Sequence, residues 1–239
     1  ESTMNIKTLS MTIAAGSLLA TGAMADYTEL SYSAVDNMDG TWTARIFANF
    51  SAATDELDAV YGDADNLLLI SSTDGFYQNP FGGNTSADIN PALYPAFPSL
   101  VNDSWVTIGL EDNVGNNMLN IGIDWSSFEA GGDIESSNGT WFATPDDAQV
   151  LAGADLKVML GQFTMYGADS HVSGVINLQG KSGNFETFQE TGVTFDYHWN
   201  NHLTLNSGME FEKRRIENYN LFKEVSVTIW SVFLIQAAL

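Results

Sequence analysis

Apolar and polar residues alternate with a period of two along much of this chain, and that pattern constrains the fold more than any other feature. Within residues 41–50, one face carries only apolar side chains, namely Trp42, Ala44, Ile46, Ala48 and Phe50. Residues 29–35 alternate in the same way, and the segment DNMDG at 36–40 is rich in residues that tolerate a positive φ. Successive side chains of a strand point to opposite faces, so the two stretches predict a β-hairpin.

Further strand patterns follow along the chain, separated by turns rich in Gly, Asn and Asp. We expect strands at 66–72, 104–110, 118–124, 156–166, 172–179 and 193–199. No helical period of 3.6 residues is sustained between them. A half-buried sheet must cover its apolar face with another layer, so the pattern predicts an all-β fold. We expect an antiparallel β-sandwich of the jelly-roll or immunoglobulin-like kind, and the alternative is a closed β-barrel.

The two ends of the chain differ from the middle. Residues 4–25 begin with one cation, continue with small and apolar residues and end in Ala-Met-Ala, which predicts a bacterial signal peptide cleaved before Asp26. Residues 26–208 are expected to form one acidic domain. Residues 209–239 carry four of the chain's eight cations and an apolar run at 225–239. We interpret this tail as the product of a shifted reading frame, a short apolar anchor or an added strand, and expect membrane association only if it is genuine.

Charge and cysteine content exclude several classes of function. Residues 26–208 hold 25 Asp and Glu residues against three cations, and the chain has no Cys. Such a surface disfavours nucleic acids and anionic lipids, since both need Lys and Arg, and it attracts cations. A solvated acidic surface and dedicated cation binding both agree with this balance. Without Cys there is no disulfide framework and no thiolate metal site.

Residues 73–103 interrupt the strand pattern. Four of the five prolines lie here, together with five aromatic residues. Proline blocks pairing within a central strand, so the segment predicts a long, ordered loop. Its aromatics either pack over one open end of the sandwich or meet a ligand. The candidate ligand-binding residues are Phe76, Tyr77, Phe81, Tyr94 and Phe97, together with Trp141 outside the loop.

Calcium is the cofactor that the acidic loops favour. It takes six to eight oxygen ligands, and two segments offer carboxylates close together. Asp36 and Asp39 lie in the first hairpin turn, while Asp146 and Asp147 follow a Thr-Pro pair and precede Asp155. Neither segment matches the full EF-hand pattern, and turn chemistry alone also explains the first.

Motifs for catalysis are weak. His198 and His202 lie four residues apart, which is the spacing of a metal pair on a helix, but their surroundings favour a strand and a turn and lack the glutamate of a metalloprotease motif. We therefore expect no zinc site there. Neither a nucleophile motif nor a phosphate-binding loop occurs in the sequence. A glycosidase would need two carboxylates across a cleft, and the sequence singles out no such pair.

Four stretches of the chain are distinctive in wording: GFYQNPFGGNTSADINPALYPAFPSL, DSWVTIGLED, NGTWFATPDDAQVLAGADLKVMLGQFT and VSGVINLQG. They resemble secreted proteins of planctomycete and other marine bacteria, a set associated with PEP-CTERM sorting tails and without an established activity. The resemblance covers residues 27–180 and implies export, surface or matrix association and a β-rich domain. At the end of this chain no Pro-Glu-Pro motif occurs, and basic residues precede the apolar run.

Together these observations predict an exported, non-enzymatic protein of the cell surface or extracellular matrix, with a structural or adhesive role. The partners expected are extracellular polysaccharides or surface proteins, and no nucleic acid. A carbohydrate-binding module that uses the aromatic loop is one alternative. A secreted polysaccharide hydrolase is the other.

Overall fold

The computed structural model describes residues 27–167, 169–198, 202–205 and 209–212, and for the last two ranges only the backbone. The predicted signal peptide and most of the tail therefore lie outside the described residues. Two antiparallel sheets dominate the fold. Sheet A contains β1 (Tyr27–Asp36), β2 (Thr41–Phe50), β9 (Lys157–Tyr166) and β5 (Trp105–Val106), in the order β1-β2-β9-β5.

Sheet B has seven strands built around β10 (His171–Lys181). Its members besides β10 are β3 (Glu56–Gly62), β4 (Leu68–Ser72), β6 (Leu119–Ile121), β7 (Ile134–Ser136), β8 (Gly139–Phe142) and β11 (Thr187–His198). One side of β10 pairs with β11, and the other side pairs with β3 and β4 in succession. β8 and then β6 extend the sheet beyond β3, while β7 extends it beyond β4.

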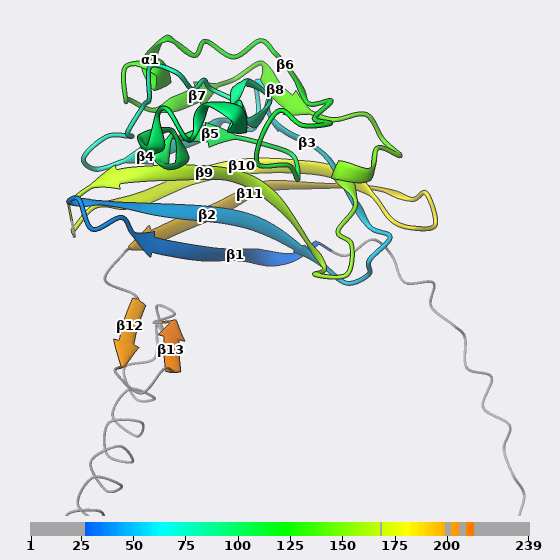
Figure 1. The fold of residues 1–239 in the computed structure, drawn as a ribbon. Helices are drawn as coiled ribbons and strands as arrows, with labels where there is room; N and C mark the ends of the chain where they lie inside the picture. Colours follow the sequence, from blue (N-terminus) through cyan, green and yellow to red (C-terminus); the bar gives the residue numbers. More distant parts are fainter. Residues whose placement is uncertain (1–26, 168, 199–201, 206–208, 213–239) are drawn as a thin grey trace, which may run out of the picture.

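The remaining elements are short. They are α1 (Ser126–Glu129) and the 3-10 helices η1 (Ser86–Asp88), η2 (Pro91–Leu93), η3 (Pro98–Asn102) and η4 (Ala148–Val150). β12 (His202–Leu205) and β13 (Met209–Glu212) pair with each other. In Figure 1 the long strands β1, β2, β9, β10 and β11 run across the molecule, the short strands β3 to β8 and α1 gather above them, and β12 and β13 are drawn below. None of the helices in the described residues is long and apolar enough to span a bilayer.

The main core lies between the two sheets. The apolar face predicted for β2 is buried along its whole length, with no side chain of that face more than 3% exposed. Those side chains meet residues of sheet B such as Leu57, Val172 and Tyr197 in one cluster. Within the described residues the sheets do not close on one another, so the expectation of an all-β sandwich is confirmed.

Two predicted strands are much shorter in the structure. Only Trp105 and Val106 of the segment 104–110 pair as a strand, because Gly109 adopts a φ of 79° and the amide of Leu110 turns back to the carbonyl of Ile108. The segment 118–124 pairs only at Leu119–Ile121. Conversely, β3, β7, β8 and the first half of β11 lie outside the predicted strands.

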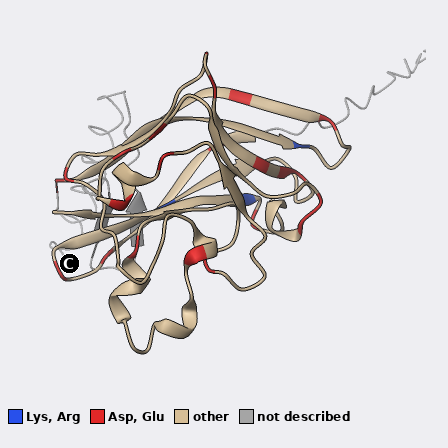
Figure 2. Cartoon of the chain, turned by 90° about the horizontal axis from the view of Figure 1, so that it is seen from above, with Lys and Arg blue, Asp and Glu red and all other residues tan. Residues whose placement is uncertain are grey.

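Charge is distributed rather than focused. Figure 2 shows Asp and Glu spread over turns, loops and strands. This spread agrees with a solvated acidic surface, and local geometry must single out any cation site.

Candidate functional site

The long loop at 73–103 forms a layer on the outer face of sheet A. A second apolar cluster lies beneath it, with Ile89 and Leu100 from the loop packed on Met159 of β9 and on Trp105. Phe47 of β2 packs against this cluster, on the face of the strand opposite to the main core. The loop therefore covers the back of a sheet rather than one open end of the sandwich, and it carries its own small core.

Asp103 fixes the path of this loop. Its carboxylate accepts hydrogen bonds from the backbone amides of Asn79, at 2.6 Å, and Gly83, at 3.1 Å. The side chain is fully buried, and burial raises the pKa of Asp103 to about 6 although these hydrogen bonds act in the opposite direction. A Cβ at Gly82 would lie 1.6 Å from Oδ2 of Asp103, so only glycine fits at that position. One carboxylate at the end of the loop thus holds the segment 79–83 near its beginning.

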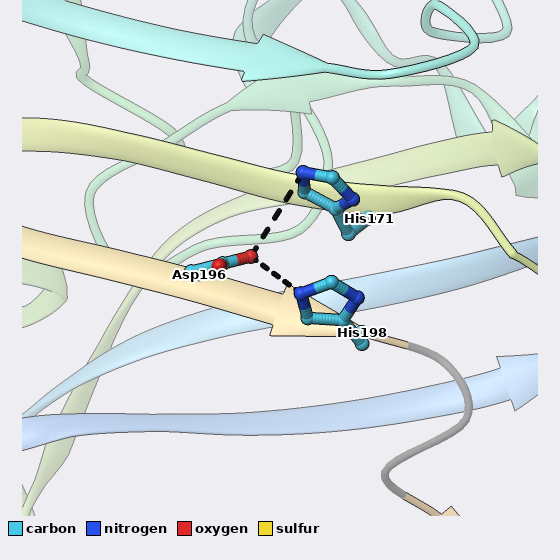
Figure 3. A group of neighbouring side chains, drawn as sticks. All are labelled: His171, Asp196 and His198. Carbon is cyan, nitrogen blue, oxygen red and sulfur yellow. Dashed lines mark ion pairs between the residues drawn. The ribbon is translucent and has the colours of Figure 1, made fainter. Parts of the chain in front are cut away.

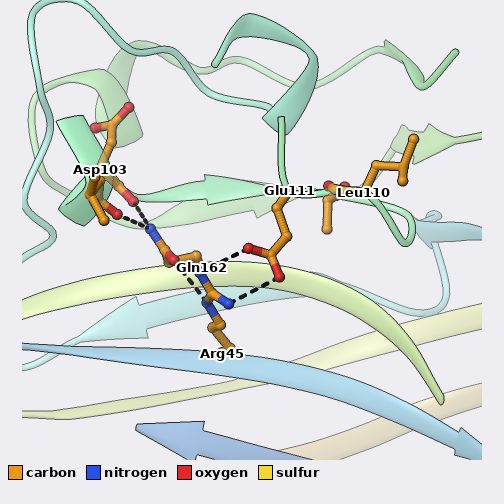
Figure 4. Close-up of polar contacts among 7 residues, drawn as sticks. Arg45, Asp103, Leu110, Glu111 and Gln162 are labelled. Carbon is orange, nitrogen blue, oxygen red and sulfur yellow. Dashed lines mark hydrogen bonds and ion pairs between the residues drawn. The ribbon is translucent and has the colours of Figure 1, made fainter. Parts of the chain in front are cut away.

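A polar chain then connects the loop to the sheet (Figure 4). Nε2 of Gln162 on β9 donates to the carbonyls of Asp103, at 2.8 Å, and Val101, at 2.9 Å. Its Oε1 accepts from Nε of Arg45 on β2, at 3.0 Å. Arg45 in turn forms a bidentate ion pair with Glu111, with both N–O distances at 3.0 Å. The contacts run from strand to loop without a break, so the loop is part of the scaffold.

Two candidate ligand-binding residues belong to the core instead. Phe76 is 2% exposed and packs against Phe128 and Phe163 at ring-centroid distances of 5.5 and 5.4 Å. Trp141 is fully buried, and its indole N–H donates to the carbonyl of Thr107 at 3.0 Å. Neither side chain can reach a ligand in solvent, so these two assignments are corrected: the apolar bulk of both residues fills the sandwich.

Phe81 and Phe97 remain at the surface as a stacked pair, which we call the aromatic face. Their rings lie 3.7 Å apart at an interplanar angle of 24°. Phe81 is 46% exposed, whereas Phe97 is half-buried against the second cluster. One ring is therefore anchored and presents the other to solvent.

The two tyrosines of the loop are half-buried and serve its internal structure. Tyr77 accepts a hydrogen bond from Nδ2 of Asn79 at 3.0 Å and meets Tyr166 edge to face. Tyr94 packs against the second cluster, and burial raises the pKa of its phenol. Tyr77 and Tyr94 are close in sequence to Phe81 and Phe97. Their side chains, however, contact other residues of this protein.

The acidic residues assigned to calcium are not brought together. Oδ1 of Asp36 accepts from the amide of Met38, and Asp39 accepts from Thr41, which are contacts of a tight hairpin turn. Asp147 caps η4 through the amide of Gln149 and accepts from Asn117. Asp155 lines a different hollow, beside Arg45 and Lys157. Local turn and capping chemistry therefore accounts for Asp36, Asp39 and Asp147.

Asp146 lies instead beside two carboxylates of β3, Glu56 and Asp58, which no sequence pattern singles out. Its amide donates to Oε2 of Glu56 at 3.4 Å, and its charge acts on Asp58. Asp58 is 6% exposed and its Oδ1 has no hydrogen-bond partner. Burial, and next the nearby Glu56, raises the pKa of Asp58 to about 6. Asp58 borders an open hollow of ≈ 410 Å³ whose other lining residues include Tyr61, Thr140, Phe142 and Gln179.

Three side chains of the kinds that can bind metals lie elsewhere on sheet B, at the start of β10 and the end of β11. His171, Asp196 and His198 bring one ligand atom each to within 4.8 Å of one another (Figure 3). The side chain of His202, the predicted partner of His198, lies outside the described residues. The histidine near His198 in space is the distant His171, because the hairpin register pairs these two residues.

Comparisons with known proteins assign no family. No family model matches the sequence, and no curated protein matches it. Among solved structures, a DUF4466 family protein from Parabacteroides merdae gives a TM-score of 0.21 at 7% sequence identity. That match covers 71% of this chain and 46% of the other, so the chain spans less than half the length of that protein.

Proposed function

We propose that this protein is an exported, non-enzymatic adhesive protein of the cell surface or extracellular matrix, and that it contacts its partner through the aromatic face. The observation that carries the proposal is the stacked pair, in which Phe81 stays 46% exposed while resting on Phe97. Covering an exposed ring removes apolar area from water, which contributes about 25 cal/mol per Å². The pair offers a flat apolar surface that a partner can cover.

The support beneath the aromatic face also favours binding. Asp103 at the end of the loop holds the segment 79–83 in place, and Gln162 connects Asp103 to sheet A. A surface that is already ordered loses little conformational entropy when a partner docks. Loops held by a rigid β scaffold are where binding residues commonly lie.

The chemistry of the partner follows from the ring and the charge. A flat aromatic ring packs against the C–H face of a sugar or against an apolar patch of a protein. The chain's net charge of −22 disfavours an acidic partner. Neutral polysaccharides and neutral or basic surface proteins are therefore the partners to test.

The test compares two phenylalanines. Phe81→Ala should abolish adhesion of the purified protein to cells or polysaccharide and leave its melting temperature nearly unchanged. Phe185→Ala is the matched control, because Phe185 is 73% exposed in the turn between β10 and β11, away from the loop. Undiminished adhesion of Phe81→Ala, or equal losses in both variants, would exclude the aromatic face.

A carbohydrate-binding module is the second candidate, and the hollow on sheet B favours it. Tyr61 and Phe142 line that hollow together with the polar side chains of Gln179 and Thr140. Apolar walls with a few polar groups are typical of small-ligand sites. On a glycan array, glycan binding lost in Phe142→Ala but kept in Phe81→Ala would assign carbohydrate recognition to this hollow.

The hydrolase alternative is tested on the same protein. A carboxylic acid with a raised pKa is one requirement of a glycosidase, and Asp58 meets it. Glu56 lies two residues away on the same strand, so it does not face Asp58 across a cleft. Release of reducing sugar from a polysaccharide, lost in Asp58→Asn, would replace the proposal with an enzymatic function.

A further inference from the structure

Three side chains of the kinds that can bind metals lie on the outer face of sheet B, at one end of the β10–β11 hairpin. His171 pairs with His198 across the two strands, and Asp196 precedes His198 by two residues and so shares its face. The alternate residues Val172, Phe195 and Tyr197 point the other way, into the main core. Strand pairing and core packing thus place all three side chains on one side of the sheet (Figure 3).

Both strands that carry these side chains are paired within sheet B, and β10 is paired on both of its sides. β11 pairs with β10 along the whole length of β10, from His171 to Lys181. On the opposite edge, Thr73 bonds His171 twice: its amide donates to the carbonyl of His171 at 3.3 Å, and its hydroxyl accepts from the amide of His171 at 3.2 Å. The site therefore rests on paired strands, which hold ligand positions better than a free loop does.

The separations between ligand atoms suit a small ion. Oδ1 of Asp196 lies 2.9 Å from Nε2 of His198 and 4.0 Å from Nε2 of His171. Zinc binds His nitrogen and carboxylate oxygen at about 2.0–2.2 Å in a tetrahedron, which sets ligand atoms about 3.3 Å apart. The two observed distances bracket that value, so small side-chain rotations give an ion three protein ligands.

An ordinary hydrogen bond explains only part of this arrangement. Contact between Asp196 and His198 accounts for two of the three side chains. It does not account for His171, whose ring stacks on that of His198 at a centroid distance of 4.4 Å and turns its Nε2 toward the same carboxylate. All three potential ligand atoms lie within 4.8 Å of one another, which places them close enough to share one metal ion.

The ligand set selects the class of metal. Two imidazoles and one carboxylate suit Zn²⁺ and its neighbours among the divalent transition metals, whereas Ca²⁺ and Mg²⁺ prefer oxygen ligands. The net charge of −22 raises the local concentration of any cation. Three protein ligands leave one tetrahedral position for water or for a group of a partner.

We propose that His171, Asp196 and His198 bind one divalent transition-metal ion, with zinc as the probe, and that the ion fastens the end of β11 to the start of β10. The proposal does not depend on the adhesive function, because the aromatic face lies on the loop over sheet A and this site lies on sheet B. Either can fail without the other.

Calorimetric titration of metal-free protein, produced without a polyhistidine tag, tests the site directly. We expect one Zn²⁺ per chain in the wild type. His171→Ala, His198→Ala and Asp196→Ala should each weaken binding at least 10-fold, and the double variant of His171 and His198 should abolish it. Glu190→Ala is the matched control for Asp196→Ala, since both carboxylates are exposed on β11, and it should bind like the wild type. Unchanged zinc binding in the double variant would overturn the proposal.

Thermal melting provides a second readout that does not depend on the variants. A hundredfold excess of Zn²⁺ over its Kd should raise the melting temperature by about 5–10 °C. The same concentration of Ca²⁺ should leave it unchanged. An equal response to both ions would show general binding by the acidic surface and would contradict a site built from imidazoles.

Discussion

The outer faces of sheets A and B differ in how far other parts of the chain cover them. The outer face of sheet A is covered by the loop at 73–103, with a second apolar cluster between them. Among the residues that the structure describes, the outer face of sheet B carries the hollow around Tyr61 and Phe142 as well as the cluster of His171, Asp196 and His198. In sheet A, β9 is therefore buried on both faces, whereas sheet B leaves polar side chains on its outer face accessible to solvent.

The largest effect expected from this difference is on folding stability. Leu100→Ala would open a cavity beneath the loop, where Leu100 is fully buried, and should cost about 2–5 kcal/mol of unfolding free energy. Leu69→Ala is the matched control, because Leu69 lies on β4 of sheet B and is only partly buried. We expect the control to lose much less, by denaturant unfolding. Equal losses would mean that the loop does not bury a core of its own.

A smaller effect is expected on the pH dependence of the unfolding free energy, through Asp58. The folded state raises the pKa of Asp58 from 3.8 to about 6, so between these values it binds more protons than the unfolded state. The free energy of unfolding should therefore fall as the pH rises from about 4 to 6, and Asp103 acts in the same sense. Asp58→Asn should flatten this slope and add roughly 1–3 kcal/mol at pH 7.

The control for this experiment is Asp124→Asn. Asp124 is exposed, and hydrogen bonds from Ser126 lower its pKa, so its contribution has the opposite sign and the variant should not gain stability at pH 7. Stability curves measured by denaturant unfolding between pH 4 and 7 separate the two cases. A wild-type curve that rises across this interval would contradict the assignment to Asp58 and Asp103.

The smallest effect is expected at the ion pair between Arg45 and Glu111. Both side chains are partly exposed, at 35% and 52%, so solvent screens their attraction. Glu111→Gln should cost less than about 1 kcal/mol, and the loss should shrink as salt is added. Chemical unfolding at low and high salt measures it. A large, salt-independent loss would show that the pair, rather than the apolar cluster, holds the loop on sheet A.

Sequence patterns predicted the fold class where the alternation was complete. β2 presents an uninterrupted apolar face, and the structure buries that face as expected. β3 escaped prediction because Glu56 and Asp58 occupy buried positions and a bulge between Leu57 and Ala59 breaks the period of two. Charges inside a strand and an extra residue hide it from any pattern based on alternation.

The candidate sites depend on register and packing, which a linear pattern does not contain. His171 and His198 are neighbours only because β10 and β11 pair in one register. If the predicted strands 172–179 and 193–199 are taken to form a hairpin, the contact between His171 and His198 follows. For the loop, the aromatic content predicted an ordered segment, but only packing decides that Phe76 is buried and Phe81 exposed.

Order in the loop is the central claim, since both the covered sheet and the aromatic face depend on it. Hydrogen exchange at the amides of Asn79 and Gly83, which donate to Asp103, tests it most directly. We predict that these amides open with free energies within about 2 kcal/mol of those in β2 and β9, because the loop unfolds with the sheet that it covers. Exchange at the rate of an unprotected peptide, while the strands stay protected, would contradict the account.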